Sequence, residues 1–272
     1  MQPVIKWAGS KRSQAKVIIS YFPKEIETYC EPFLGGGSVL LELLKTKDIE
    51  VAKFIASDVN QDLINLWNCI KNTPNDLISH YTILHKEFNS KDIQHRKDYF
   101  NLIRKRYNEL RDPKDFFFIS RTTTNGLIRY NRKGEFNNSC HFSRPGINPE
   151  TIAKIILETA ELIKDVEFLH LSYDNLVVGN NDFLYLDPPY FATNGMYFGG
   201  FEEKSFFNWV GKIPCKWVLS YDGLVDGEDN TYAVPKDLYI RHEFIESGLS
   251  SFRRLMTQTN KIIHESLYLN YE

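Results

Sequence analysis

The segment from Thr28 to Ser38 reads TYCEPFLGGGS and sets the fold of this 272-residue chain. A short apolar stretch runs into the glycines Gly35 to Gly37, and a helical pattern follows from Ser38 to Lys45. Val51 to Asp58, rich in β-branched and aromatic residues, predicts a second strand. Strand, glycine turn, helix and strand in this order predict a β-α-β unit, whose turn lets a nucleotide-like ligand approach the backbone closely.

Asp58 ends the second predicted strand, at the position where a carboxylate holds ribose hydroxyls in dinucleotide-binding folds. The glycine run lacks the third glycine of GxGxxG, and no Lys-Ser or Lys-Thr follows it as a P-loop requires. The pattern therefore favours an adenosine ligand, while a plain structural turn followed by a helix cap remains the alternative.

The rest of the chain alternates helix and strand around a helical middle. Helices are predicted at Ala15 to Tyr21, Val59 to Ile70, Leu77 to Glu87 and Lys97 to Leu110. Strands are predicted at Val166 to Leu171, Asp182 to Leu186, Trp217 to Ser220 and Ile262 to Tyr271. The interval from about Gln61 to about Ile147 thus reads as a helical insertion in an α/β fold.

Composition excludes several classes of protein. With 42% hydrophobic and 25% charged residues, the chain is typical of a globular protein, and a net charge of −2 excludes a simple polycationic coat for nucleic acid. Basic residues outnumber acidic ones eight to four from Lys91 to Lys114, and five to one from Arg121 to Arg144. A basic middle favours a phosphate-facing segment, with a solvated helix face as the alternative.

Cysteine and histidine spacing indicates neither zinc nor a disulfide framework, so no metal is expected. No apolar run reaches the length of a membrane span, and the first residues do not resemble a signal peptide. We therefore expect a cytoplasmic protein without a membrane partner.

The strongest signal is Asp187-Pro188-Pro189-Tyr190, directly after the apolar strand that ends at Leu186. The two prolines fix φ, so a carboxylate and a carbonyl can point the same way. An exocyclic amine on a base is a poor nucleophile, and Asp187 with the Pro188 carbonyl can accept its two hydrogens as it attacks an electrophilic methyl group. Tyr190 can stack on a base rotated out of a duplex. A Pro-Pro strand terminator with an aspartate turn is the structural alternative.

Taken together, these motifs resemble those of Dam-like DNA adenine-N6 methyltransferases (D12 class, alpha group) over nearly the whole chain. Lys6-Trp7-Ala8-Gly9-Ser10-Lys11 resembles the KWAGGK opening, Glu31 to Ser38 the EPFxGxGS cofactor loop, and Ser57 to Ile64 the ribose motif. Asn125 to Asn137 resembles the recognition hairpin, and Asp187 to Tyr190 the catalytic tetrad.

The resemblance implies a Rossmann-like, S-adenosylmethionine-dependent methyltransferase fold with a mostly parallel sheet. Residues 1–60 and 148–272 would form the catalytic domain, and residues 61–147 an inserted helical target-recognition domain carrying a hairpin. The cofactor would be S-adenosyl-L-methionine, and the product N6-methyladenine in double-stranded DNA. The implied catalytic residues are Asp187, Pro188, Pro189 and Tyr190. The implied cofactor-binding residues are Trp7, Ala8, Gly9, Lys11, Glu31, Pro32, Phe33, Gly35, Gly37, Ser38, Asp58, Tyr173 and Asp187.

The resemblance also assigns Leu127 to a thymine methyl group and Arg129 to a guanine edge, whereas a phosphate contact is the alternative for Arg129. The implied DNA-binding residues are Lys6, Arg121, Thr124, Asn125, Gly126, Leu127, Arg129, Asn131, Arg132, Lys133 and Asn137. Many relatives recognise GATC, but Thr124 stands where they often carry an aromatic residue, and Asn138 to Phe142 replaces their VPFG-like hairpin ending. We therefore expect a site that overlaps GATC or relaxes it at an outer position.

Other functions remain open from the sequence. A nicotinamide-dependent oxidoreductase would use the glycine loop and Asp58 but has no use for Asp187 to Tyr190. A catalytically silent DNA-binding module would use only the basic middle, and methyl transfer to an amino nitrogen of cytosine or of RNA is a minor alternative. The enzyme is expected to be a monomer in solution, acting alone, within a mobile element, or beside a separate restriction endonuclease.

Overall fold

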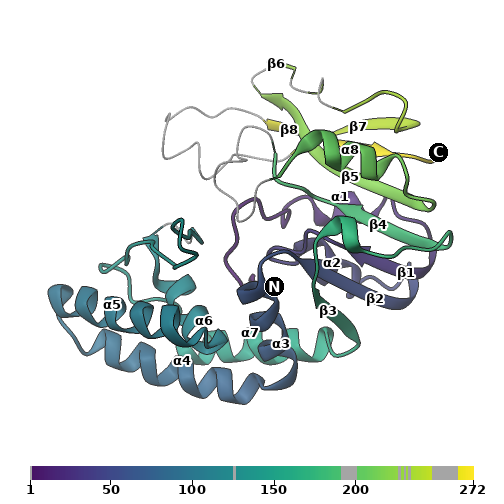
Figure 1. Ribbon diagram of the computed structural model, residues 1–272. Coiled ribbons are helices and arrows are strands. Elements are labelled where there is room, and N and C mark those ends of the chain that lie inside the picture. Colours follow the sequence, from purple (N-terminus) through teal and green to yellow (C-terminus); the bar gives the residue numbers. More distant parts are fainter. Residues whose placement is uncertain are drawn as a thin grey trace. The chain divides into compact units, whose positions relative to one another are not determined.

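The computed structural model describes residues 2–124, 127–190, 201–225, 228–229, 231, 234–246 and 263–272. The chain divides into two compact units, each of which draws on several segments (Figure 1). The helical unit consists of Met1–Ser10, Gly35–Gly37 and Asn60–His170, and the sheet unit of Lys11–Leu34, Ser38–Val59 and Leu171–Glu272.

The sheet unit is built on a mixed sheet whose first strands are parallel. Its strands are β1 (Glu25–Glu31), β2 (Glu50–Asp58), β4 (Asp182–Leu186), β5 (Lys216–Val225), β6 (Glu228–Asp229), β7 (Arg241–Glu246) and β8 (Ile263–Leu269). Within this unit the order is β2-β1-β4-β5-β8-β7, with β6 paired to β5. The pairs β1 with β2, β1 with β4, and β4 with β5 are parallel, whereas β8 is antiparallel to both of its neighbours.

Central strand β4 reads Asp-Phe-Leu-Tyr-Leu and is buried from Phe183 onward, as expected for a parallel strand covered on both faces. Leu184 and Leu186 join Trp217 of β5 and Phe206 of α8 in one apolar cluster. The helices of this unit are α1 (Ala15–Ile19), α2 (Ser38–Leu43), the 3-10 turn η2 (Tyr173–Asn175) and α8 (Glu203–Val210). This core fixes the ends of the strands.

The strand order reverses direction at β1. From β1 the chain crosses to β2 on one side, whereas β4 pairs on the other, with Cys30 opposite Leu184. In open α/β sheets ligands bind outside the carboxyl ends of the strands at such a switch point. Glu31, Asp58 and Asp187 end or directly follow β1, β2 and β4, so the fold places three carboxylates at the ligand-binding edge.

The helical unit contains α3 (Gln61–Asn72), α4 (Pro74–Asn89), α5 (Ile93–Leu110), α6 (Pro113–Thr122), α7 (Pro149–Leu162) and strand β3 (Val166–His170). Side-chain caps begin these helices: Asn60, Asp92 and Asp112 accept hydrogen bonds from backbone NH groups of α3, α5 and α6. Its core is aromatic, with Tyr81 packed edge-on against Phe117 and Trp67 stacked on Phe168. These contacts make the insertion a folded body with its own core.

The α/β fold predicted from the sequence is confirmed, as are all the predicted helices and strands, with shifts of a few residues at their ends. Among the described residues, helices α6, α7 and α8, the turn η2 and strands β6 and β7 were not predicted. Helix α6 is buried from Asp115 to Thr122, and its apolar residues form one continuous run from Phe116 to Ile119, whereas β7 is a largely exposed, charged strand without apolar alternation. Helices α7 and α8 carry ordinary amphipathic patterns that were overlooked.

Within the described residues, no helix combines the length and the apolar character that crossing a membrane requires.

Candidate active site and recognition hairpin

Asp187 leaves β4 at the ligand-binding edge and pairs with Lys11, whose Nζ lies 2.9 Å from Asp187 Oδ1. Lys11 is only 5% exposed, although it carries a full charge. It lies just before α1, and its backbone carbonyl accepts the first bonds of that helix from Gln14 and Ala15. Two chain segments far apart in sequence therefore meet at one buried ion pair.

A second carboxylate shares this lysine. Glu265 Oε2 on β8 lies 3.6 Å from Lys11 Nζ and accepts a 3.3 Å hydrogen bond from the Tyr190 hydroxyl. The Lys11 ammonium also lies 4.7 Å from the centre of the Tyr190 ring, which meets Tyr221 edge-on. We call Lys11, Asp187, Tyr190 and Glu265 the catalytic cluster.

The pKa of Asp187 is raised to about 6 in all. Burial and the negative charge of Glu265 raise it, while Lys11 and the Tyr190 hydroxyl lower it. Asp187 is therefore mostly ionised near pH 7. An ionised carboxylate that is held in place and shielded from water is a strong hydrogen-bond acceptor, as the amine chemistry predicted from the sequence requires.

Glu31, at the end of β1, is 3% exposed and accepts a 2.7 Å hydrogen bond from the Tyr29 hydroxyl. Burial raises the pKa of Glu31 to about 8; the hydrogen bond from Tyr29 opposes this shift, and the nearby charge of Asp187 adds to it. Glu31 thus carries its proton through most of the neutral range, which leaves Asp187 as the ionised carboxylate of the pair.

The expected ribose carboxylate, Asp58, is buried at the end of β2. Its backbone carbonyl accepts a bond from Leu171, and Leu34 donates to the carbonyl of Ser57. Phe33 and Tyr173 stack with ring centres 5.4 Å apart, so two predicted cofactor residues form one aromatic wall in the sheet unit. The buried hydroxyl of Ser57 has no hydrogen-bond partner among the described residues. Pro32 is buried, and Ser38 begins α2.

The glycine loop packs against Trp7 in the helical unit. Gly35 has a φ of +48°, and a Cβ there would lie 2.8 Å from Trp7 Cδ1, so only glycine fits. The Gly35 carbonyl accepts a 3.1 Å bond from the Trp67 indole. Gly37 is buried, whereas Ala8 and Gly9 are exposed.

The segment after α6 folds back on itself as the sequence predicted for the recognition hairpin. Antiparallel bridges join Thr123 to Cys140 and Tyr130 to Phe136. The tip turns at Asn131, whose side chain accepts from the backbone of Lys133 and Glu135. Arg129, Arg132 and Lys133 are exposed, Leu127 and Thr124 are half-buried, and Asn125 and Gly126 lie outside the described residues. Arg129 Nε donates to Asn137 Oδ1 at 3.0 Å.

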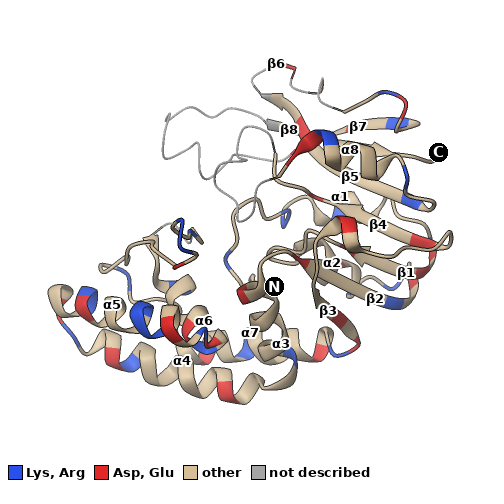
Figure 2. Ribbon diagram, viewed as in Figure 1, with Lys and Arg blue, Asp and Glu red and all other residues tan. Residues whose placement is uncertain are grey.

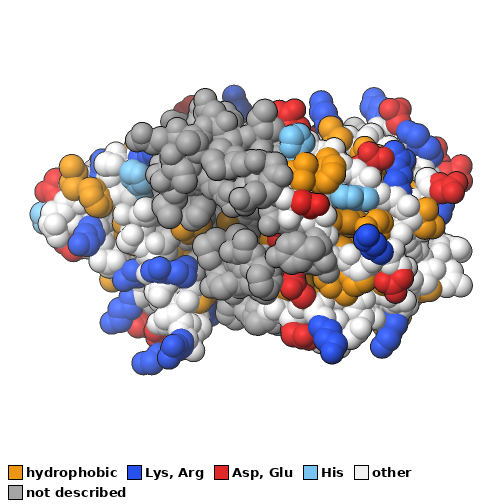
Figure 3. Space-filling view, turned by 90° about the horizontal axis from the view of Figure 1, so that it is seen from above, with side chains coloured by type: hydrophobic (Ala, Val, Ile, Leu, Met, Phe, Trp, Pro, Cys, Tyr) orange, Lys and Arg blue, Asp and Glu red, His pale blue; other side chains and the backbone are white. Residues whose placement is uncertain are grey.

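Helix α5 and Asp62 of α3 hold this hairpin in place. Arg104 and Arg111 donate to the carbonyls of Asn138 and Gly134 in the hairpin, while the Tyr130 hydroxyl donates to Asp62. Part of the basic middle therefore performs a structural task and does not face a phosphate. Other Lys and Arg residues are distributed along the helices and the hairpin of the helical unit (Figure 2), and Lys and Arg side chains lie at the surface at the left of the space-filling view (Figure 3).

Arg121, predicted to bind DNA, is 7% exposed and donates to the backbone carbonyls of Pro3 and Val4. These hydrogen bonds hold the N-terminal segment in place. Nearby Lys6 is exposed, and its pKa is lowered by desolvation and by the charges of Arg121 and Arg144. A like-charged cluster of this kind is suited to an anionic partner.

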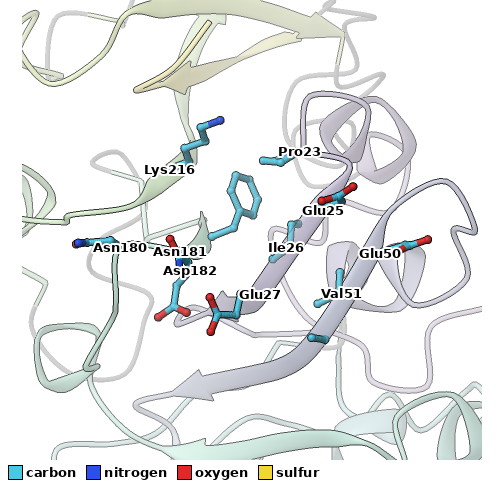
Figure 4. Close-up of a pocket in the computed structure, with 12 residues that line it drawn as sticks. Pro23, Glu25, Ile26, Glu27, Glu50, Val51, Asn180, Asn181, Asp182 and Lys216 are labelled. Carbon is cyan, nitrogen blue, oxygen red and sulfur yellow. The ribbon is translucent and has the colours of Figure 1, made fainter.

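A cavity of about 640 Å³ lies at the other edge of the sheet, at the amino ends of β1, β2, β4 and β5 (Figure 4). Its charged lining is mainly acidic, with Glu25, Glu27, Glu50 and Asp182 against Lys216. It stands at the end of the parallel strands opposite to Asp187, so it is separate from the catalytic cluster.

A half-buried carboxylate, Asp187, thus lies at the switch point of an α/β sheet, and the helical unit bears a basic hairpin. Residues 7–208 match the family described as D12 class N6 adenine-specific DNA methyltransferase. The chain belongs to this family.

Curated relatives agree with the family. The chain is 35% identical to the type II methyltransferase M.MjaIII of Methanocaldococcus jannaschii, over 71% of this chain and 71% of that protein. It is 29% identical to the type II methyltransferase M.CviBI of Paramecium bursaria Chlorella virus NC1A, over 84% of this chain and 89% of that protein. It is 31% identical to a DNA adenine methylase of Vibrio cholerae, over 68% of this chain and 64% of that protein.

Among solved structures, an rRNA methyltransferase aviRa from Streptomyces viridochromogenes aligns over 99% of this chain and 90% of that chain, at 10% identity and a TM-score of 0.41. The family membership excludes the oxidoreductase and the silent DNA-binding module as descriptions of the chain.

Sequence reasoning missed Glu265 and Asp62. The predicted strand from Ile262 to Tyr271 contains Glu265, but only the antiparallel pairing of β8 with β5 brings its first residues to the edge where β4 ends. Asp62 lies in the first turn of α3, a position at which carboxylates are common, so its contact with the hairpin could not be predicted from the sequence.

Glu31→Gln should make stability at alkaline pH higher than in the parent. Because folding raises the pKa of Glu31 from 4.5 to about 8, the folded state holds the proton more tightly and the parent loses stability as pH rises through that window. Glutamine has no proton to lose, so the variant should gain on the order of 1 to 3 kcal/mol over the parent at pH 8 relative to pH 5. Urea unfolding at both pH values measures this, with Glu27→Gln, exposed on the same strand, as the control. Equal pH slopes for Glu31→Gln and parent would refute the assignment.

Proposed function

We propose that the protein transfers a methyl group from S-adenosyl-L-methionine to N6 of an adenine rotated out of double-stranded DNA. The observation that carries this proposal is the half-buried, ionised Asp187 paired with the buried Lys11 at the switch point of the sheet, followed by two prolines and Tyr190. The family to which the chain belongs indicates that the substrate is adenine in DNA.

The chain's own residues explain how a weak nucleophile is activated. Asp187 and the Pro188 carbonyl accept the two hydrogens of the amino group, so that the nitrogen lone pair becomes available and the developing positive charge is stabilised. The N6 nitrogen gains the methyl group as its bond to sulfur breaks, S-adenosylhomocysteine is left, and the nitrogen loses one proton, which the Asp187 carboxylate can accept. Tyr190 stacks on the extruded base and offsets part of the cost of unstacking it. When bound, S-adenosylmethionine supplies the methyl group as an electrophile.

The residues present fit that methyl donor. Ser57, a buried hydroxyl without a partner among the described residues, stands beside Asp58 at the carboxyl end of β2, where a ribose is expected. Phe33 and Tyr173 offer an aromatic wall for the donor, and Glu31 lies at the end of β1 for its methionine part. The other assigned donor contacts are carried by the family resemblance: Trp7, Ala8, Gly9, Lys11, Pro32, Gly35, Gly37, Ser38 and Asp187.

Target recognition is proposed for residues 61–147, with residues 1–60 and 148–272 as the catalytic part. Exposed Arg129 on the braced hairpin is suited to a guanine edge and half-buried Leu127 to a thymine methyl group. Lys6, Thr124, Asn125, Gly126, Asn131, Arg132, Lys133 and Asn137 are proposed to contact DNA. Arg121 would act through the N-terminal segment that it holds. The proposed site overlaps GATC or relaxes it at an outer position.

We also propose that the protein works in the cytoplasm as a monomer. Similarity to proteins named type II methyltransferases favours a place beside a separate restriction endonuclease.

Asp187→Asn should abolish methyl transfer while DNA binding persists. The amide keeps the shape but loses the charge that stabilises the reacting nitrogen, at a cost of at least ~2.7 kcal/mol, about a hundredfold in rate. Transfer of labelled methyl groups into DNA, beside a DNA-binding titration, measures both effects. Asp182→Asn, at the amino end of the same strand, is the matched control and should transfer normally. Activity of Asp187→Asn within tenfold of the parent would overturn the proposed role.

Arg129→Ala should relax recognition at one G·C pair by about 1 to 3 kcal/mol. Arg132→Ala, on the same hairpin, should instead weaken all sequences alike and reduce the salt slope by about one. Rates on a set of single-base variants of the site distinguish the two residues. If Arg129→Ala keeps the parent's order of preference among those sites, Arg129 reads no base.

A further inference from the structure

Lys11 occupies the interactions that the target base needs, if the proposed function holds. Its ammonium is bonded to Asp187 at 2.9 Å and lies 4.7 Å from the centre of the Tyr190 ring. In the proposed reaction the same carboxylate accepts from the adenine amino group, and the same ring stacks on the base. A carboxylate can accept several hydrogen bonds, but the ammonium lies over the ring on which the base would stack, so it has to move along toward another carboxylate when adenine enters.

Glu265 is placed to be that partner. Its Oε2 lies 3.6 Å from Lys11 Nζ, so a small displacement converts a long contact into a close ion pair. The same oxygen accepts the hydroxyl of Tyr190. A lysine that is 5% exposed cannot turn to water as an alternative, because its charge must stay paired inside the protein.

The sheet explains why β8 supplies this residue. Strand β8 runs antiparallel to β5 with Ser266 opposite Tyr221, so the beginning of β8 lies at the edge where the parallel strands end. Tyr221 in turn packs edge-on against Tyr190. Glu265 is thereby held by the sheet, and its position does not depend on the segment from Asp187 to Tyr190.

We propose that Glu265 is a positioning residue that takes over the Lys11 ammonium from Asp187 as the target amino group arrives, and that holds Tyr190 through its hydroxyl. This inference rests on the proposed function, since it requires Asp187 to accept from the amino group.

The test uses the pH dependence of kcat/KM for DNA, which reports the groups of the free enzyme. The titratable groups that bear on Asp187 and Glu265 are Lys11, Glu31, Tyr185, Tyr190 and Asp222. Activity should fall on the acid side near pH 6, as the Asp187 carboxylate takes up a proton. The charge of Glu265 raises the pKa of Asp187, so removal of that charge should move the acid limb to lower pH.

Glu265→Gln should lower the maximal rate by roughly tenfold to a hundredfold, because Lys11 stays on Asp187. Its acid limb should move down by about half a pH unit or more. Glu265→Asp keeps the charge but withdraws it from Lys11 and Tyr190, so its rate should fall while its acid limb stays near that of the parent. Glu243→Gln, a half-buried carboxylate on neighbouring β7 paired with Arg241, should match the parent in both readouts.

A Glu265→Gln rate equal to the parent's overturns the inference, and so does a lowered rate with an unmoved acid limb, which is the mark of a merely structural residue. If Glu265→Gln does not fold, a Glu265→Asp variant with the parent's rate overturns it as well. Asp187→Asn, assayed in parallel, separates this failure from that of the proposed function. An active Asp187→Asn variant would contradict both the proposed function and the role of Glu265. An inactive Asp187→Asn variant, together with a Glu265→Gln variant that has the parent's rate, would contradict only the role of Glu265.

Discussion

The buried ion pair between Lys11 and Asp187 is the interaction on which the site depends. Charges rarely persist away from water unless they are paired, and here one ammonium neutralises a carboxylate that a strand end has carried into the protein. Without Lys11, burial and the charge of Glu265 would drive Asp187 toward its protonated form, which is a poorer acceptor. The pair thus keeps Asp187 ionised, and it also occupies Asp187 until substrate arrives.

The same division of labour governs the helical unit. Arg104 of α5 and Arg111, directly after it, donate to hairpin carbonyls, and Tyr130 donates to Asp62. These hydrogen bonds hold the hairpin whose exposed residues include Arg129, Arg132 and Lys133. Net charge alone could not separate these roles. The sequence cannot distinguish an arginine that holds a loop from an arginine that contacts a phosphate. Only burial and hydrogen bonding in the structure distinguish them.

Sequence patterns predicted the sheet, the glycine turn and the catalytic loop because each is local: a strand, its terminating residues and a helix start lie within a few positions of each other. Glu265 could not be found this way, since its partners are set by strand order and register. Helix α6 was hidden because its apolar residues, Phe116 to Ile119, form one continuous run and do not recur at helical spacing. The chemistry was thus predictable from motifs, whereas the groups that tune it required the fold.

Mapping the modified base tests the central claim most directly. Purified protein is incubated with duplex DNA and S-adenosylmethionine, and the products are sequenced by a method that distinguishes N6-methyladenine from methylated cytosines. The account predicts N6-methyladenine at one recurrent short motif. Methyl groups on cytosine, or no modification by a folded protein that binds both substrates, would contradict it.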